Sequence, residues 1–214
     1  MISFDRGEAL RYMGYHGAEP DAAVAESLER CAAELQAAVQ PKSISARFPL
    51  SFTGENTMQI GDLTVTSANL ARNLRGCTEV YLMAATLGIG ADRLIARASA
   101  VRMSDAVILQ AVAAAMIETC CDEVNDALRH MAEREGLYCR PRFSPGYGDF
   151  SIEHQRDFSR LLDTPRKIGL TVTESCLLAP IKSVTAVIGL SPEKQDCHRK
   201  GCEECGKTDC NFRR

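Results

Sequence analysis

The sequence VILQAVAAAMIETCC, residues 107–121, is the most apolar segment of this 214-residue chain. Gln110 and Glu118 interrupt it, and no uncharged run reaches the length of a membrane span. The segment lies within a predicted helix over residues 105–135, which Ser104 caps and Gly136 stops. Because the first half of this helix is apolar nearly all round, we expect it to be a buried helix at the centre of a globular domain.

The segments around this helix do not follow the regular strand–helix–strand order of a parallel sheet. Helices are predicted over residues 8–12, 21–40, 67–75 and 152–162 and from residue 91 onward, and strands over 45–52, 58–65, 79–85, 137–143, 167–173 and 183–190. Asp21 and Ser67 are the predicted N-caps of two of these helices. This order predicts an α+β fold with a mainly antiparallel sheet and packed helices.

The composition limits the classes of function. With 45% hydrophobic residues, 25% charged residues and a formal net charge of −3, the chain has the composition of one globular domain. No block of like charge favours a nucleic acid or an anionic membrane as partner. Asp5, Arg6 and Glu8 stand where a signal peptide needs its apolar stretch, so we expect a cytoplasmic protein with reduced thiols.

Six of the ten cysteines are scattered through apolar segments, where cysteine usually acts as a small hydrophobic residue. They are Cys31, Cys77, Cys120, Cys121, Cys139 and Cys176. The other four are concentrated in the last eighteen residues.

A glycine loop, Gly88-Ile89-Gly90, stands between the predicted strand over 79–85 and a helix. This order is found in phosphate-binding loops, but the third glycine and the lysine–serine pair of the P-loop are missing. A tight turn is the better interpretation.

The stretch RFSPGY, residues 142–147, fits neither a helix nor a strand. Pro145-Gly146 is typical of a turn, and the lack of a Cβ at the glycine allows another molecule to approach the main chain. Arg142 has a planar guanidinium suited to a carboxylate, and Tyr147 has a ring with a hydroxyl tip, so together they suit a zwitterionic ligand such as an amino acid. These six residues alone favour a simpler interpretation, in which Arg142 is a solvated strand end and Tyr147 packs over the turn.

The segments that follow change this interpretation. In chain order they are RFSPGY, a continuation containing His154, Leu161-Leu162-Asp163, IGLTVTES at 168–175, Ala179-Pro180 and Ser183-Val184. Together they resemble the activation domain of cobalamin-dependent methionine synthase over roughly residues 138–191. That family has an arginine, three residues and then Gly-Tyr where it binds S-adenosylmethionine, and the matching positions here are Arg142, Gly146 and Tyr147. RYMGYHGAEPD, residues 11–21, resembles the start of stand-alone versions of this domain.

The resemblance implies a single C-shaped α+β domain that holds S-adenosylmethionine in a shallow groove. In this family, cobalamin oxidised to the cob(II) state is rescued by one electron and a methyl group from S-adenosylmethionine, giving methylcobalamin. Arg142 would anchor the methionine carboxylate, and main-chain groups around Ser144 and Gly146 would orient the ligand. Tyr147 would lie at the catalytic position, where the methyl group meets cobalt. Glu174 would place the ligand's ammonium or, equally well, have a structural role at a strand end.

The homocysteine, folate and cobalamin modules of the large enzymes have no counterpart in this sequence. The implied role is therefore that of an accessory protein for a separate cobalamin-dependent methionine synthase lacking its own activation domain, or for another corrinoid protein. A flavodoxin or a ferredoxin is a candidate electron donor. The aspartate that the large enzymes contribute from near the start of this domain has no matching position here.

A composition shift at Ser191-Pro192 divides the chain into a predicted domain over residues 1–191 and a Cys-rich tail over 192–214. The tail contains Cys197, Cys202, Cys205 and Cys210 in the spacing C-x4-C-x2-C-x4-C. Four thiolates this close in sequence can hold one zinc ion or an iron–sulfur cluster, and the spacing does not decide between them. The implied reaction consumes an electron, which favours a cluster.

The tail also contains Asp196-x-His198-x-x-Gly201, a pattern by which many cobalamin proteins present a histidine to cobalt. Too few residues follow Gly201 for the domain that buries the nucleotide end of the cofactor, so we interpret the match as a coincidence and His198 as a substitute or neighbouring metal ligand. Two alternative functions stay open: a redox activator of a corrinoid protein that uses a C-terminal iron–sulfur cluster, and a zinc-tailed interaction module without chemistry.

Overall fold

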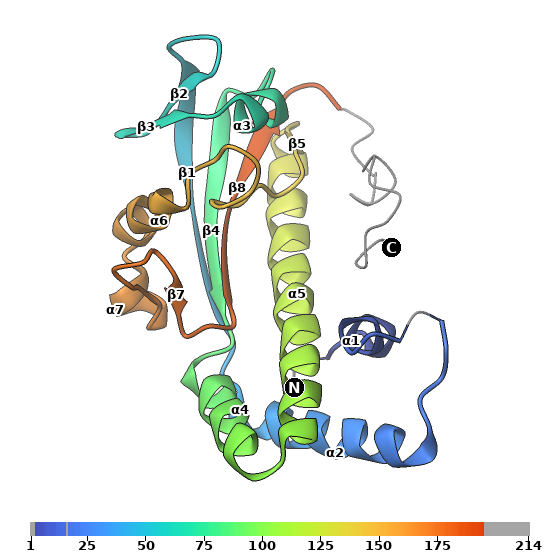
Figure 1. Ribbon diagram of the computed structural model, residues 1–214. Coiled ribbons are helices and arrows are strands. Elements are labelled where there is room, and N and C mark those ends of the chain that lie inside the picture. Colours follow the sequence, from blue (N-terminus) through green and yellow to red (C-terminus); the bar gives the residue numbers. More distant parts are fainter. Residues whose placement is uncertain (1–2, 16, 195–214) are drawn as a thin grey trace.

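The computed structural model describes residues 3–15 and 17–194 (Figure 1). At its centre lies a six-stranded sheet in the order β3-β2-β1-β4-β8-β5, in which each neighbouring pair of strands is antiparallel. The strands are β1 (Lys42–Phe52), β2 (Thr57–Ile60), β3 (Leu63–Thr66), β4 (Glu79–Thr86), β5 (Tyr138–Cys139) and β8 (Ser183–Ser191). The predicted α+β class with a mainly antiparallel sheet is confirmed.

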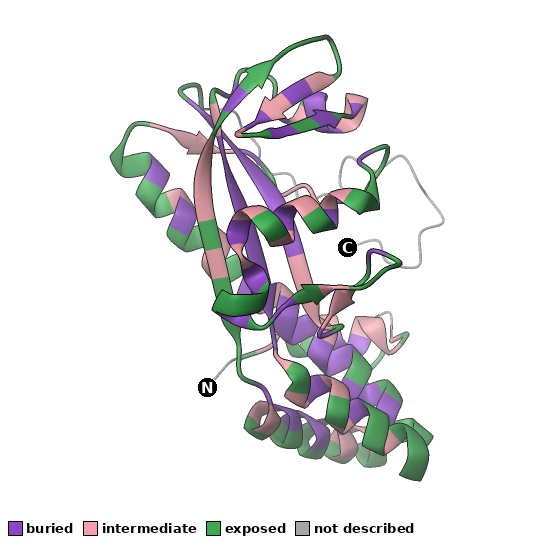
Figure 2. Ribbon diagram, turned by 90° about the vertical axis from the view of Figure 1, so that its left-hand side faces the viewer, coloured by how far each residue is buried: buried purple, intermediate pink, exposed green. Residues whose placement is uncertain are grey.

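The strands β4 and β8 form the buried middle of the sheet. They pair from Glu79 opposite Leu190 to Thr86 opposite Ser183. Most residues of both strands are inaccessible to solvent, as the purple strands in Figure 2 show. This burial on both faces explains why their sequences are nearly continuous apolar runs and do not alternate with polar residues.

Four helices form a layer on one side of the sheet (Figure 1). They are α1 (Arg6–Tyr12), α2 (Ala22–Ala38), α4 (Ile89–Val101) and α5 (Met103–Arg134). By length and composition α5 could cross a membrane, but 61% of its most apolar window is buried within the protein. Leu109, Val112 and Met116 of this helix are at most 1% exposed. The prediction of a buried core helix is confirmed.

Shorter elements cover the other side of the sheet and enclose a second core. They are α3 (Ala68–Asn73), the 3₁₀ turn η1 (Ile152–His154), α6 (Gln155–Leu162), α7 (Thr164–Ile168) and a small hairpin of β6 (Thr171–Val172) and β7 (Leu178–Ala179). Phe150 and Phe158 are fully buried here and pack in the same cluster as Leu82 of the central strand. The chain before and after Phe150 is therefore fixed against the sheet.

Two predicted helix caps are confirmed, and one is wrong. The Asp21 carboxylate accepts a hydrogen bond from the Val24 N–H at 2.9 Å, and the Ser67 hydroxyl accepts one from the Leu70 N–H at 3.0 Å. Ser104 is not an N-cap, because α5 already begins at Met103 and the extended residue before it is Arg102.

Three predicted strands differ from the structure. The run over 58–65 is two strands, β2 and β3, because the chain reverses at Gly61, whose φ is 59°. The predicted strand over 137–143 is reduced to β5 and one isolated bridge from Phe143 to Val187. Pro141 lies between these two contacts and cannot donate a ladder hydrogen bond.

The prediction of a strand over 167–173 is largely wrong. Its first residues end helix α7, which has Pro165 in its first turn and Gly169 in the left-handed conformation at its C-cap. These are standard helix start and stop signals, and they override the β-like composition of the run. The remaining strand residues belong to the small β6–β7 hairpin and not to the main sheet.

Candidate functional site

The RFSPGY loop leaves the sheet edge next to β8. Phe143 exchanges two 2.9 Å main-chain hydrogen bonds with Val187, and the chain then turns away. The Tyr147 N–H donates to the Ser144 carbonyl at 3.2 Å, and the Gly146 N–H donates to the Phe150 carbonyl at 2.8 Å. Gly146 has a φ of 96°, where a side chain would be strained. The predicted turn is confirmed, and part of its main-chain hydrogen-bonding capacity is already used internally.

Asp149 fastens this loop to the N-terminus of α3. Its carboxylate accepts hydrogen bonds from the Ser67 hydroxyl and from the main-chain N–H groups of Ala68 and Asn69. These donors, the Ser67 hydroxyl first among them, lower the pKa of Asp149 to about 2. Asp149 thus fixes the position of Tyr147, two residues earlier, relative to the sheet.

This anchor is expected to make stability depend on pH in acid. Because the pKa of Asp149 is depressed in the folded state, its contribution is complete above about pH 4 and is lost as the pH falls towards about 2. Thermal unfolding of the protein and of Asp149→Asn should therefore differ most above pH 4 and converge near pH 2. An NMR titration of the Asp149 carboxyl with a midpoint near 4 would contradict this prediction.

Arg142 lies against α5 and is ion-paired there. Its Nη2 is 2.9 Å from Oδ1 of Asp122 and 3.3 Å from Oε2 of Glu118. The Arg142 side chain is only 22% exposed, and its Nη1 is buried without a hydrogen-bond partner. The alternative of a solvated strand end is therefore wrong. The Nη1 group of Arg142 can therefore still donate hydrogen bonds.

Tyr147 projects into solvent and is 68% exposed. The alternative in which its ring packs over the turn is wrong, since that packing would have buried it. Large exposed aromatic residues on an otherwise anchored loop are common contact points for other molecules.

Glu174 lies in the turn between β6 and β7. Its main-chain carbonyl accepts a 2.6 Å hydrogen bond from Arg156 of α6, and its exposed carboxylate forms no ion pair with the described residues. The RFSPGY loop borders the turn η1 just before α6, since a Cβ on Gly146 would lie 3.7 Å from Ile152. The structure thus brings the two motifs to one region, but pairs Arg142 with carboxylates of α5 and not with Glu174.

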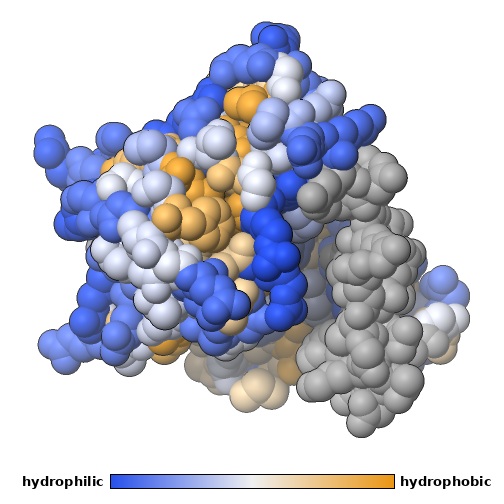
Figure 3. Space-filling model, turned by 90° about the horizontal axis from the view of Figure 1, so that it is seen from above, coloured by the Kyte–Doolittle hydropathy of each residue, from blue (hydrophilic) through white to orange (hydrophobic). Residues whose placement is uncertain are grey.

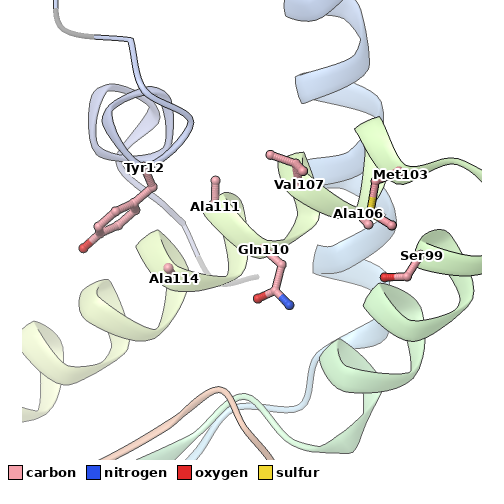
Figure 4. Close-up of a pocket in the computed structure, with 8 residues that line it drawn as sticks. All are labelled: Tyr12, Ser99, Met103, Ala106, Val107, Gln110, Ala111 and Ala114. Atoms are coloured by element: carbon pink, nitrogen blue, oxygen red, sulfur yellow. The ribbon is translucent and has the colours of Figure 1, made fainter. Parts of the chain in front are cut away.

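A shallow hollow of about 380 Å³ follows α5 below this ion-pair cluster. Figure 4 shows Tyr12 from α1 and Ser99 from α4 at opposite ends of a row of α5 side chains. The row consists of Met103, Ala106, Val107, Gln110, Ala111 and Ala114. Ala114 is one helical turn before Glu118, so the hollow and the Arg142 cluster share one side of α5.

Tyr12 connects the hollow to the charges above it. Burial raises the pKa of its hydroxyl, and the negative charges of Glu8 and Glu118 raise it further. The hydroxyl donates to Glu8 at 3.3 Å. The site thus combines an apolar floor, a neutral hydroxyl and a cation–carboxylate cluster, which is a composition suited to a ligand with apolar and zwitterionic parts.

The described cysteines are not arranged for metal binding. Within residues 3–15 and 17–194, no three His, Cys, Asp or Glu side chains are grouped so that they could hold a metal ion. Burial raises the pKa of Cys121 to about 12 and that of Cys139 to about 11, so both are thiols at neutral pH. This agrees with their predicted role as small hydrophobic residues. Cys197, Cys202, Cys205 and Cys210 lie outside the described residues.

Glu118 and Asp122 are the site residues that the sequence interpretation missed. Their signal is present in the sequence, because two carboxylates four residues apart occupy one face of a mostly apolar helix. The sequence did not indicate, however, that this face would meet the RFSPGY loop.

The arrangement of an antiparallel sheet, packed helices and an exposed loop at the sheet edge defines a class of α+β domain already seen in solved structures. The crystal structure of the MetH reactivation domain bound to AdoHcy superposes with a TM-score of 0.66 over 90% of this chain and 75% of that chain. The two sequences are 16% identical. The expected activation-domain fold is thereby confirmed as a fold. No family model and no curated protein sequence matches the chain.

Proposed function

We propose that this protein binds S-adenosylmethionine and supports the reductive methylation of cob(II)alamin on a separate cobalamin-dependent methionine synthase or a related corrinoid protein. The fold is similar to that of a reactivation domain that was crystallised with AdoHcy, the demethylated form of this ligand. The observation that carries the proposal is the unpartnered, buried Nη1 of Arg142 within that fold. Buried donors are rarely left without an acceptor, and a ligand carboxylate would satisfy this one.

The ligand's ammonium group would be held by Glu118 and Asp122 in place of Glu174. An amino acid has its carboxylate and ammonium on one carbon, so the arginine and the acidic residue that bind them must be neighbours. Glu118 and Asp122 are within 3.3 Å of Arg142, whereas Glu174 accepts a hydrogen bond from Arg156 through its main-chain carbonyl and its carboxylate has no ion pair with the described residues. Glu174 would then have a structural role at a strand end, which is the alternative to placing the ammonium group.

The adenosyl part of the ligand would extend along the hollow of α5. The volume of about 380 Å³ lies at the lower end of the range for small-molecule sites, and its lining of alanine, valine and methionine suits a flat ring. Main-chain groups at Ser144 and Gly146 that the turn itself does not use are available to orient the ligand.

Tyr147 would lie between the methyl donor and the acceptor. Reductive methylation takes one electron from an outside donor, such as a flavodoxin or a ferredoxin, and transfers the methyl group from the sulfonium of S-adenosylmethionine, which leaves as AdoHcy. The chain's own residues would hold the sulfonium and exclude water from it. The exposure of Tyr147 supports a role at the boundary with a partner protein that carries the corrinoid.

Replacing Tyr147 with alanine is expected to separate binding from transfer. The exposed ring makes no hydrogen bond through its hydroxyl to the described residues, so S-adenosylmethionine should still bind within about twofold, while transfer falls by at least about tenfold because a positioning contact is lost. AdoHcy formation can be measured with cobalamin and titanium(III) citrate in place of the partner and the electron donor. Equal transfer rates for the two proteins, or no cobalamin-dependent AdoHcy, would contradict the proposal.

The proposal includes a division into a domain over 1–191 and a metal-binding tail over 192–214. Cys197, Cys202, Cys205 and Cys210 would hold an iron–sulfur cluster or zinc, and a cluster would suit a reaction that consumes an electron. Iron and sulfide analysis with an electron paramagnetic resonance spectrum of anaerobically purified protein tests this part. A stoichiometric zinc content without iron would exclude the cluster.

A further inference from the structure

A second cavity lies where α2, α4 and α5 converge, at the bottom of the molecule in Figure 1. Its volume is about 680 Å³, which is within the usual range for small-molecule sites. It shares no lining residue with the hollow beside Tyr12. Figure 3 looks down on the opposite end of the molecule, where hydrophilic side chains surround a hydrophobic patch. The cavity is therefore separate from the described residues to which the proposed function assigns a part.

The floor of this cavity is apolar. Leu109 of α5 is 1% exposed, and Leu94 and Ala98 of α4 are half-buried and pack against the same core. Val101, also in the lining, is 81% exposed. Small side chains keep the gap open, because Ala37 of α2 and Ala98 of α4 stand where longer side chains would fill it. The cavity thus presents an apolar surface to a ligand.

Three arginines and two carboxylates stand around this floor, so the walls carry a net charge of +1. Nη2 of Arg30 is 2.9 Å from Oδ1 of Asp105, and Nη1 of Arg102 is 3.5 Å from Oδ2 of the same carboxylate. Arg30 also contacts Glu34 at 3.3 Å. Both carboxylates of the cavity are thus paired. Arg97, the third arginine, is exposed and forms no ion pair with the described residues.

The cavity suits an anionic group joined to an apolar body. Its net positive charge disfavours a cation. A neutral apolar ligand would cover the Arg97 guanidinium without giving it an acceptor, which costs free energy. A carboxylate, a sulfonate or a phosphate would accept two parallel hydrogen bonds from the guanidinium while the body covers the apolar floor.

We propose that this cavity binds a small organic anion, with its apolar body over Leu94, Ala98 and Leu109 and its acidic group on Arg97. This inference does not rest on S-adenosylmethionine binding. Asp105 at the cavity and Glu118 beside Arg142 are about 20 Å apart along α5, at a rise of about 1.5 Å per residue. The two ligands would therefore not compete for the same charged groups.

Titration with 8-anilinonaphthalene-1-sulfonate, a fluorescent sulfonate with apolar rings, tests the site. Wild-type protein should bind it saturably, and Arg97→Gln should weaken binding by about tenfold, because a hydrogen bond to a charged group is lost. The matched control is Arg93→Gln. Arg93 is also an exposed arginine of α4 without an ion pair among the described residues, but it does not line this cavity. This control and Arg142→Ala should both bind the sulfonate as wild type does.

The uncharged dye N-phenyl-1-naphthylamine has the same rings without the sulfonate and separates the contribution of the charge from that of the floor. Its affinity should be equal for wild type and Arg97→Gln. Ala98→Phe should lose both dyes, because the added ring occupies the floor, and circular dichroism shows whether this variant folds. If it does not fold, the two dyes on Arg97→Gln still decide.

Equal affinity of wild type and Arg97→Gln for the sulfonate would overturn the proposal. An equal loss of both dyes in Arg97→Gln would overturn it too, because the arginine would then not be reading the charge. A failed S-adenosylmethionine titration would leave the proposal standing, since neither dye depends on Arg142.

Discussion

Replacing Arg142 with alanine is expected to weaken the binding of S-adenosylmethionine by about 10- to 150-fold, the usual effect of losing a hydrogen bond to a charged group. The guanidinium is held in place by Glu118 and Asp122 and has an unpartnered Nη1. Alanine removes the only side chain that we assign to the ligand's carboxylate. Isothermal titration calorimetry of both proteins measures the effect.

Arg166→Ala is the matched control for this experiment. Arg166 is 87% exposed and lies 3.7 Å from Asp163, its one ion-pair partner in the described part of the chain, so its loss should leave binding unchanged. Thermal unfolding of Arg142→Ala should show a modest loss of stability, because partly exposed ion pairs contribute little. Equal affinity of wild type and a folded Arg142→Ala protein would show that the carboxylate is held elsewhere.

Replacing Gly90 with alanine is expected to lower the free energy of unfolding by about 3 kcal/mol, towards the upper end for an overpacked site. A Cβ at this position would lie 2.0 Å from the carbonyl oxygen of Ala38 and 2.9 Å from its carbon. Both are main-chain atoms at the end of α2, so the start of α4 must move away from α2. Urea denaturation measures the change.

Gly54→Ala is the control for the glycine experiment, because its nearest neighbour would be 3.5 Å away and its φ is not positive. It should change stability by no more than about 0.5 kcal/mol. If Gly90→Ala were as stable as this control, the packing of α4 on α2 would be wrong. The same close contact explains why a glycine is needed in the loop after β4, because α4 packs against α2 too closely for a Cβ at residue 90. This agrees with the interpretation of the loop as a tight turn.

Much of the fold could be predicted because its signals are local. The caps at Asp21 and Ser67 depend on contacts within four residues, and the burial of α5 follows from its apolar composition. The errors arose where two local signals competed. In the run over 167–173, β-like composition stood against Pro165 and Gly169, and the helix signals prevailed.

Only the loop that contributes Tyr147 to the candidate site could be predicted from the sequence, and the α5 residues opposite it could not. The exposed turn with Tyr147 follows from Pro-Gly chemistry and the motif spacing. The partners of Arg142 are 24 and 20 residues earlier on another element, and nothing local indicates that α5 packs against this sheet edge. The same holds for Asp149, whose three donors come from residues about 80 positions earlier.

The central claim, that this chain binds S-adenosylmethionine at Arg142, is tested most directly by one calorimetric titration of anaerobically purified wild-type protein with that ligand. The account predicts saturable binding with one site per chain. The absence of binding at millimolar ligand would contradict it.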